Sequence, residues 1–559
     1  MVFSEFKYER PNMAKVKAEG KAIVKRIKKA KSYAEVKDCV DALNKLNQHI
    51  TTMGTLVEIR HTIDTKDAFY EKEQAFFDTE APKLMPVMLA YYQALLASPF
   101  VKELEADLGK HFIEIAELQV RSMNKKLIVP MIRQNKLTSR YQKLIASCSV
   151  ELLGEKRNLS GLSMLMQSTD RETRKLAYDA FAGFFAEHEA ELDEIYDKLV
   201  KLRDGMGRKM GFENFIPLAY LNMGRVDYNA EDVRKFREQV ARDLVPVCHE
   251  LREAQKARIG VDKIRYYDES LLYPDGNAKP NGTREEMQAQ ALAMYKELSK
   301  DTGEFFQMMC DQELMDLETK PGKAAGGYCT FLPDYNVPFI FSNFNGTSGD
   351  VDVLTHEAGH AFQAYCTSKC QSVPEYLFGS SETAEIHSMS MEFFAYPWMD
   401  KFFGDAAEKY KKLHTTEGLT FVPYGVCVDE FQHRVYEKPN MTPAERKAVW
   451  KELEQKYLPD RDYEGKEIFE KGGFYFQKLH IFMYPFYYID YTLASMAAFE
   501  FYGKMHQDRE AAWKDYRRLC DLGGSRAYRE LLKEAHLCDP FVEGSVKKAM
   551  QPLVDFVKA

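Results

Sequence analysis

Apolar side chains recur at helical spacing through most of this 559-residue chain. Within residues 169–203, four apolar residues have the 3,4,3 spacing that places side chains on one face of a helix: Leu192, Ile195, Leu199 and Leu202. Similar patterns recur in residues 11–118, 230–258, 284–317 and 442–456. Neither a Ser/Gly-rich linker nor a repeat of about 20 to 50 residues divides these segments. The pattern predicts a mainly α-helical protein.

Two segments depart from the helical pattern. Residues 142–166 contain a glycine-centred turn between apolar runs, which is typical of a β-hairpin. In residues 322–347, three glycines precede an alternating aromatic run bounded by Pro338 and Gly346, which indicates one or two strands. We therefore expect a small β-sheet within an otherwise helical body.

The order of these segments predicts two lobes. Residues 1–200 would form a mostly helical N-terminal lobe with the hairpin near 142–166. Residues 201–559 would form a catalytic lobe that contains the small sheet (about 322–347), a pair of helices (about 348–398) and a tyrosine-rich helical region near the C-terminus.

Charge and cysteine content exclude several classes of protein. The 77 Lys and Arg against 85 Asp and Glu give a net charge of −8, so no basic excess favours binding to nucleic acid. The first 20 residues carry charges and Pro11 where a secretory signal needs an apolar run, and no window of about 18 apolar residues predicts a membrane span. The ten cysteines form no CxxC pair, which is typical of reduced thiols. We expect a cytoplasmic protein without membrane contact.

A possible metal site lies in the segment that follows the predicted strand. Residues 347–366 read TSGDVDVLTHEAGHAFQAYC, with acidic residues at the start of a helical pattern. His356 and His360 are four residues apart, so on a helix both imidazoles can bind one ion. Glu357 lies beside them and could take a proton from a water that the metal has acidified. A chance match of two unrelated histidines is the alternative.

A catalytic zinc site needs a third protein ligand. Extended HExxH motifs have Gly and His at the positions where this chain has Gln363 and Cys366, so the third ligand is expected to be a carboxylate. Residues 379–398 form a predicted helix that offers several candidates.

Spacing alone does not choose among these candidates, which are Glu382, Glu385, Glu392 and the nitrogen ligand His387. Glu385 and Glu392 are seven residues apart and share a helix face. If one of them binds the metal, the other can orient a ligand imidazole from behind.

The motif and its surroundings resemble a known family. His356–His360 in HEAGH, followed by Glu385 in ETAEIH, is similar to the oligoendopeptidase F branch of the thimet oligopeptidase family of zinc metallopeptidases, which includes Pz-peptidase-like proteins. The resemblance extends over residues 158–178, 203–220, 326–329, 338–345, 428–437 and 480–491, and so covers most of the chain.

The resemblance implies a ligand set and a fold. One Zn²⁺ per chain would be bound by His356, His360 and Glu385, with Glu357 as general base and Glu392 behind the ligands. Two helical lobes would enclose a deep channel that admits short peptides and excludes folded proteins. The implied activity is hydrolysis of internal peptide bonds by a zinc endopeptidase inside the cell.

The tyrosine-rich segment contributes further candidates. His480, Tyr484, Tyr488 and Tyr491 share one face if the segment is a single helix. They resemble residues of the family that bind substrate and donate to the oxyanion, so His480, Tyr484 and Tyr491 are candidate catalytic residues and Tyr488 a substrate-binding one. Packing of aromatic side chains at a helix interface is the alternative.

A peptide substrate is expected to bind as an extended strand. The strand within residues 338–345 could pair with it through backbone hydrogen bonds, and the glycines before it would permit close approach. The predicted substrate-binding residues of this region are Gly326, Gly327, Tyr328, Phe339, Phe341 and Asn343.

Three alternative functions remain open at this stage. A dipeptidyl carboxypeptidase or other exopeptidase of related fold would need a cationic group that captures a free C-terminus. An inactive peptide-binding protein would bind metal without turnover. A helical scaffold with a chance motif would respond to a chelator neither in activity nor in thermal stability. The sequence does not indicate the oligomeric state.

Overall fold

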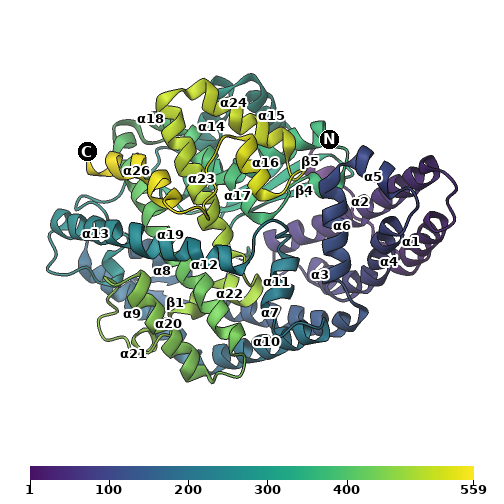
Figure 1. Cartoon of the computed structure of the whole chain (residues 1–559). Helices are drawn as coiled ribbons and strands as arrows, with labels where there is room; N and C mark the ends of the chain where they lie inside the picture. The colour runs from purple at the N-terminus through teal and green to yellow at the C-terminus, as the bar shows by residue number, and fades with distance from the viewer. Residues whose placement is uncertain (321) are drawn as a thin grey trace.

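The computed structural model describes residues 1–320 and 322–559 and is mainly α-helical (Figure 1). Its first helices lie together at one side of the molecule and enclose a hydrophobic cluster of their own, which includes Ile23, Val36, Tyr91, Leu104 and Phe112. The helices around this cluster are α1 (Met13–Ile27), α2 (Tyr33–Ile63), α4 (Met85–Leu96), α5 (Val101–Leu108) and α6 (Lys110–Ser122), whereas α3 (Ala68–Glu80) places Phe77 in the larger cluster of the molecule.

A hairpin follows helix α7 (Ile128–Ala146). Strands β1 (Val150–Leu152) and β2 (Glu155–Arg157) pair in antiparallel fashion within the range predicted for a hairpin. The two turn residues, Leu153 and Gly154, have positive φ angles of 55° and 81°, as a tight two-residue hairpin turn requires.

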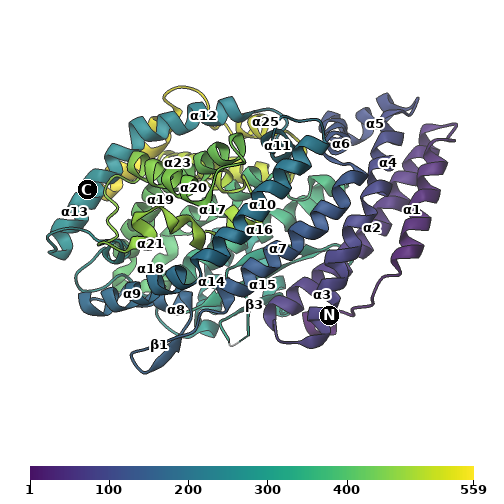
Figure 2. The same cartoon turned by 90° about the horizontal axis from the view of Figure 1, so that it is seen from below.

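The helical pattern of residues 169–203 corresponds to two helices. After the short α8 (Leu159–Leu165), α9 (Arg171–Glu187) begins at Asp170, whose carboxylate accepts a hydrogen bond from the backbone of Thr173 at 2.9 Å. The longer α10 (Glu189–Lys209) buries Leu192, Ile195 and Leu199 and lies alongside α7 (Figure 2). Because α10 runs through residue 200, the predicted lobe boundary falls inside a continuous helix. The division into two domains stays a prediction.

The remaining helices pack around the larger hydrophobic cluster of the molecule. Those before the sheet are α11 (Ile216–Asn222), α12 (Ala230–Gln239), α13 (Val245–Ile259), α14 (Arg284–Leu298) and α15 (Lys300–Asp311). Those after it are α16 (Gly349–Cys370), α17 (Ser381–Phe394), α18 (Met399–Phe403), α19 (Ala407–Glu437), α20 (Pro443–Tyr457), α21 (Glu467–Glu470), α22 (Leu479–Met483), α23 (Tyr488–Gln507), α24 (Arg509–Leu522), α25 (Tyr528–Glu534) and α26 (Ser545–Lys558).

The second sheet has three strands in the order β3-β5-β4. Strand β5 (Val337–Phe344) pairs in parallel with β3 (Met315–Glu318) and in antiparallel fashion with β4 (Tyr328–Leu332). The sequence did not predict β3, because it overlaps the end of a helical pattern. It also led to a wrong expectation for β5, which is paired on both sides and is therefore not available to a peptide. The two edge strands are β3 and β4.

Helices α16 and α17 pack closely against each other. Helix α16 starts directly after β5, where the Asp350 carboxylate accepts hydrogen bonds from the backbones of Asn345 (2.8 Å) and Gly346 (2.7 Å) and so fixes the turn. At Gly359, a Cβ atom would lie only 2.7 Å from the carbonyl oxygen of His387 on α17. Only glycine permits this approach, which brings the face of α16 that carries the HEAGH motif against α17.

No single helix in residues 1–320 or 322–559 is long and apolar enough to cross a membrane. One pair of segments, Ala68–Leu96 and Val101–Leu108, meets the criterion in length and composition when taken together, and the pair is bent by 103°.

Candidate metal centre

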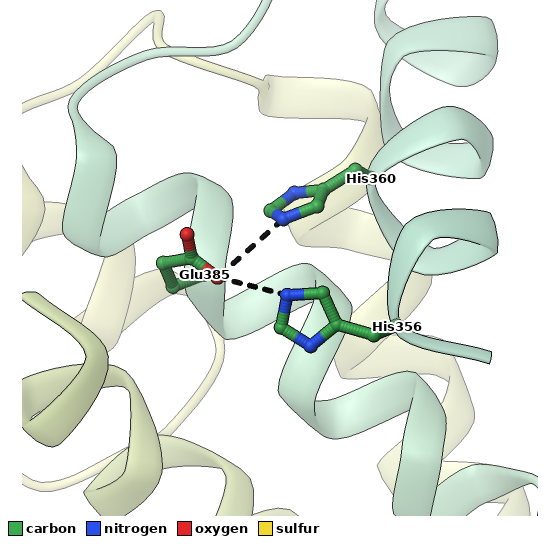
Figure 3. Close-up of side chains that lie close together, drawn as sticks. All are labelled: His356, His360 and Glu385. Atoms are coloured by element: carbon green, nitrogen blue, oxygen red, sulfur yellow. Dashed lines mark ion pairs between the residues drawn. The ribbon is translucent and has the colours of Figure 1, made fainter. Parts of the chain in front are cut away.

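The two histidines of the motif and one glutamate of α17 point at a common position (Figure 3). The Nε2 atoms of His356 and His360 lie 3.2 Å and 3.4 Å from Oε2 of Glu385. One donor atom from each residue lies within 4.8 Å of the others, and Glu385 is buried. Two imidazole nitrogens and a carboxylate oxygen are a suitable donor set for zinc, and three protein ligands leave a position open for substrate or water.

The other candidates on α17 point elsewhere. His387 Nδ1 is hydrogen-bonded to the backbone oxygen of Thr383 at 2.8 Å, and Glu382 belongs to a separate buried group near Arg225. Neither joins the cluster of donor atoms. Of the four candidates on α17, Glu385 is the one whose carboxylate oxygen joins the donor atoms of His356 and His360.

Glu392 holds His356 from behind. Its Oε1 atom lies 2.6 Å from Nδ1 of His356, and its Oε2 atom lies 2.5 Å from Nε2 of His414, whose Nδ1 lies 2.6 Å from the Tyr396 hydroxyl. Burial disfavours the charged form of His414, but the hydrogen bond to Glu392 outweighs it and raises the pKa of His414 to about 9. A protonated His414 keeps Glu392 ionised, which fixes the ring that presents Nε2 to the metal.

Tyr487 is a site residue that sequence reasoning missed. Its hydroxyl donates to Oε1 of Glu385 at 2.6 Å, and the Ser388 hydroxyl lies 3.0 Å from Oε2. These two contacts fix the plane of the Glu385 carboxylate. Tyr487 is seven residues from His480, a spacing that also falls on one helix face, so the pattern contained a signal for it.

The candidate general base, Glu357, is buried beside the metal position. Its Oε2 atom has no hydrogen-bond partner in the described part of the chain, and burial raises the pKa of its carboxyl group. A Cβ atom on Gly327 would lie 3.4 Å from Oε1 of Glu357 and 3.1 Å from Cγ1 of Val353. The segment with Gly322, Gly326 and Gly327, which we call the glycine loop, therefore lies directly against Glu357. It leaves little space for a side chain at residue 327.

The tyrosine-rich segment is not one helix, so the condition under which its residues would share one helix face is not met. Helix α22 ends at Met483, and α23 begins only at Tyr488. Even so, the His480 ring lies among the rings of all four tyrosines of the segment, with centroid distances of 5.0 to 6.1 Å.

The tyrosines of this segment differ in their surroundings. Tyr491 OH lies 3.4 Å from Nε2 of His480, whereas Tyr484 is 51% exposed. Tyr488 is buried and packs edge-on against Phe421 and Tyr424, so its ring belongs to the protein interior. Burial, with a smaller effect of Lys478, lowers the pKa of His480 to about 3, which keeps its ring neutral at physiological pH.

The predicted substrate-binding residues divide into two groups. Phe339 and Phe341 are 1% and 0% exposed, so their prediction as contact residues was wrong: β5 is the central strand and its side chains fill the core. The Tyr328 ring stacks on Phe341 at 4.8 Å, and its hydroxyl lies 2.6 Å from that of Thr62 on α2.

The glycine loop remains accessible. Asn343 donates to the carbonyl oxygens of Ala324 and Gly326, at 2.8 Å each, and so holds the loop in place. Gly326 has a φ of 96°, and a Cβ atom at this residue would meet no other atom within 4 Å. A ligand beside Glu357 could contact the backbone of Gly326 and Gly327 and the unpaired edge of β4.

Removing the Tyr487 hydroxyl is expected to weaken zinc binding. The variant Tyr487→Phe leaves one oxygen of Glu385 without its donor, and loss of such a contact typically reduces metal affinity by about 10- to 100-fold. Competition with a chromophoric chelator measures the change. Tyr502→Phe on α23 is the matched control, because it removes the hydroxyl of another tyrosine that lies outside the donor cluster. Equal affinities of the two variants would contradict the role of Tyr487.

Fold and site together define a class. A helix that carries HExxH, with a glutamate from a second helix as the third donor, is the arrangement of HExxH metallopeptidases with a carboxylate ligand. The family follows from the match of residues 3–123 to the Peptidase M3 N-terminal domain and of residues 164–551 to Peptidase family M3. The chain belongs to peptidase family M3.

Individual relatives agree with this assignment. The chain is 25% identical over 360 residues to chromosomal oligoendopeptidase F of Lactococcus lactis subsp. cremoris, a match that covers 62% of this chain and 57% of that protein. The matched region thus spans less than two thirds of the curated relative.

Two solved structures match over the whole length of this chain. The structure of Pz peptidase A with an inhibitor is 48% identical and has a TM-score of 0.98, covering 100% of this chain and 99% of that one. A Bacillus anthracis protein assigned provisionally as oligoendopeptidase F is 46% identical with a TM-score of 0.93, covering 100% and 98%.

Proposed function

We propose that the protein is a zinc endopeptidase that hydrolyses internal bonds of short, unfolded peptides inside the cell. The observation that carries the proposal is the buried Glu357 carboxylate, whose Oε2 atom has no hydrogen-bond partner among the described residues. This carboxylate lies beside the donors His356, His360 and Glu385 and against the glycine loop that leads into β4. Membership of peptidase family M3 supports it.

Each residue of the centre has a task in this mechanism. When bound by His356, His360 and Glu385, zinc acts as a Lewis acid toward water and the scissile carbonyl group. Glu392 and Tyr487 keep two of these ligands oriented. The protein thus sets the geometry of the centre before a substrate arrives.

Glu357 moves the proton in this scheme. Water adds its oxygen to the carbonyl carbon and gives a proton to the Glu357 carboxylate, which then passes it to the amide nitrogen as the C–N bond breaks. The raised pKa of the buried Glu357 suits both steps, since the group must accept and release the proton. Tyr491, whose hydroxyl lies 3.4 Å from Nε2 of His480, would donate to the oxygen that becomes negative.

Substrate would bind along the free edge of β4. A peptide in extended conformation could add as a fourth strand beside Tyr328–Leu332, with its backbone hydrogen-bonded to the strand. This mode depends on backbone groups and so accepts many sequences. We also propose that the helical body restricts access to short chains, and that the ten free cysteines belong to a protein of a reducing compartment.

Peptides blocked at both ends provide the test. We expect quenched peptides with acetylated N-termini and amidated C-termini to be cut internally, because an edge strand needs no free terminus. Mass spectrometry of the products locates the bonds. A folded protein should stay intact while unfolded fragments of the same protein are cut.

Each contrary result favours a different function. Cleavage only of peptides with a free C-terminus would indicate a dipeptidyl carboxypeptidase. Bound zinc without turnover of any peptide would indicate a peptide-binding protein, and cleavage of folded protein would contradict the size limit.

A further inference from the structure

The interrupted helix that carries the site tyrosines is held by side chains from distant parts of the chain. Between α22 and α23 the backbone turns at Phe486, a non-glycine residue with a φ of 67°. Residues other than glycine rarely adopt this left-handed conformation unless their surroundings impose it. The contacts of Phe486 identify what imposes it here.

Both backbone groups of Phe486 are bound by buried side chains. Its N–H donates to Oε1 of Gln432 on α19 at 2.9 Å, and its carbonyl oxygen accepts from Nη2 of Arg225 at 2.6 Å. The same Nη2 donates to Oδ1 of Asp490, on the first turn of α23, at 2.7 Å. The side chains of Arg225 and Asp490 are both 0% exposed.

Arg225 comes from the segment between α11 and α12, more than 260 residues before its partners. It also lies near the buried carboxyl group of Glu382 on the first turn of α17. One guanidinium group is thus placed between the helix that carries Glu385 and the helix that carries Tyr491.

The residues held in this way adjoin the metal centre. Tyr487 follows Phe486 directly and donates to Glu385, while Tyr491 follows Asp490 directly and contacts His480. A shift of the turn at Phe486 would therefore move both hydroxyl groups. The Arg225 guanidinium also lies over the rings of Tyr220 and Tyr228, with 4.5 and 5.6 Å from its Cζ atom to the ring centroids, and these contacts help to hold it in place.

We propose that Arg225 is a positioning residue of the metal centre, which acts through Phe486 and Asp490 to aim Tyr487 at Glu385 and Tyr491 at the substrate. The inference rests on the proposed function for Tyr491 but not for Tyr487, whose contact with Glu385 concerns zinc binding alone. Gln432 fixes the other side of the same turn.

The variant Arg225→Lys tests the proposal. It keeps the positive charge beside Asp490, but a lysine ammonium does not reach as far as the guanidinium nitrogens and lacks their planar fork. We expect zinc affinity, measured by chelator competition, to fall by about 10-fold and kcat to fall by about 10- to 100-fold with little change in KM.

A similarly buried ion pair between an arginine and an aspartate serves as the matched control. Arg174 donates to Asp268 at 2.6 Å, with side chains 2% and 0% exposed, and neither residue touches the metal centre. Arg174→Lys should lower the melting temperature about as much as Arg225→Lys and leave zinc affinity and kcat unchanged. If both variants have a lower melting temperature but unchanged zinc affinity and kcat, Arg225 has only a structural role and the proposal is overturned.

A double-mutant cycle separates the path through Tyr487 from a general loosening. In a Tyr487→Phe background, Arg225→Lys should cost little further zinc affinity, because the hydroxyl it positions is already gone. Fully additive losses would contradict the proposal. Zinc affinity is measured without peptide, so the cycle tests the role of Arg225 even if the wild-type protein hydrolyses no peptide. Absence of hydrolysis would refute the proposed function and not the role of Arg225.

Gln432→Met provides a second route to the same turn if Arg225→Lys does not fold. It removes the acceptor of the Phe486 N–H while keeping a side chain of similar length in the buried site. We expect the same pattern, with weaker zinc binding and lower kcat. Unchanged zinc affinity and kcat in folded Gln432→Met protein would overturn the proposal.

Discussion

Replacing Glu357 with glutamine is expected to lower kcat/KM by about two to four orders of magnitude, the range that a positioned general base contributes. Glutamine has nearly the same shape and fits the space between Gly327 and Val353, but it cannot accept a proton from water. Zinc content per chain should stay at one, because Glu357 is not among the donors that cluster around the metal position. Steady-state hydrolysis of a quenched peptide and metal analysis measure the two quantities.

Glu454→Gln is the matched control for this substitution. Glu454 on α20 is 6% exposed, as Glu357 is, but its carboxylate accepts from Tyr463 and lies outside the metal centre. Its replacement should leave turnover at the wild-type level. If Glu357→Gln retained wild-type activity with zinc bound, the proposed proton transfer would be wrong.

Removal of the metal is expected to abolish turnover and to lower the melting temperature by a few degrees while leaving the helices folded. A ligand that binds only the native state stabilises it by about 2.7 kcal/mol at a concentration 100 times its Kd. The helices should stay folded without the free energy of zinc binding, because helices throughout the chain are held together by the two buried hydrophobic clusters. Circular dichroism and differential scanning calorimetry, with and without chelator, measure both effects.

Addition of zinc after the chelator should restore activity and the melting temperature together. A Glu385→Gln variant supplies the control, because it has lost a donor and should show a much smaller response to chelator at the same zinc concentration. If the chelator changed neither the melting temperature nor the activity of the wild-type protein, the proposal that the HEAGH motif binds a metal would be wrong.

Features that depend on local sequence could be predicted well. The hairpin at 142–166 and the two helices of the metal centre follow from turn residues and helical spacing. The pairing of His356 with His360 required only the geometry of one helix turn. The selection of Glu385 over Glu382 came from resemblance, since it depends on how closely α17 approaches α16 at Gly359.

Features that depend on contacts between distant segments were missed or wrong. Strand β3 pairs in parallel with β5, so β5 is central and the edge strands are β3 and β4, and no local pattern encodes this strand order. Tyr487 reaches the centre from the turn before α23, and His414 reaches it from α19. The break at Phe486 could not be read from an aromatic run, because its cause lies in Arg225 and Gln432.

Three buried side chains from the first half of the chain bind backbone carbonyls of its last quarter: Tyr141 binds Phe476, Tyr178 binds Tyr463, and Arg203 binds Phe482. Their partners lie 335, 285 and 279 residues further on. During synthesis these side chains are therefore made long before the carbonyl groups to which they donate. The segment that carries Tyr487 is made late. A nascent chain therefore contains His356, His360 and Glu385 before it contains Tyr487, whose hydroxyl contacts Glu385.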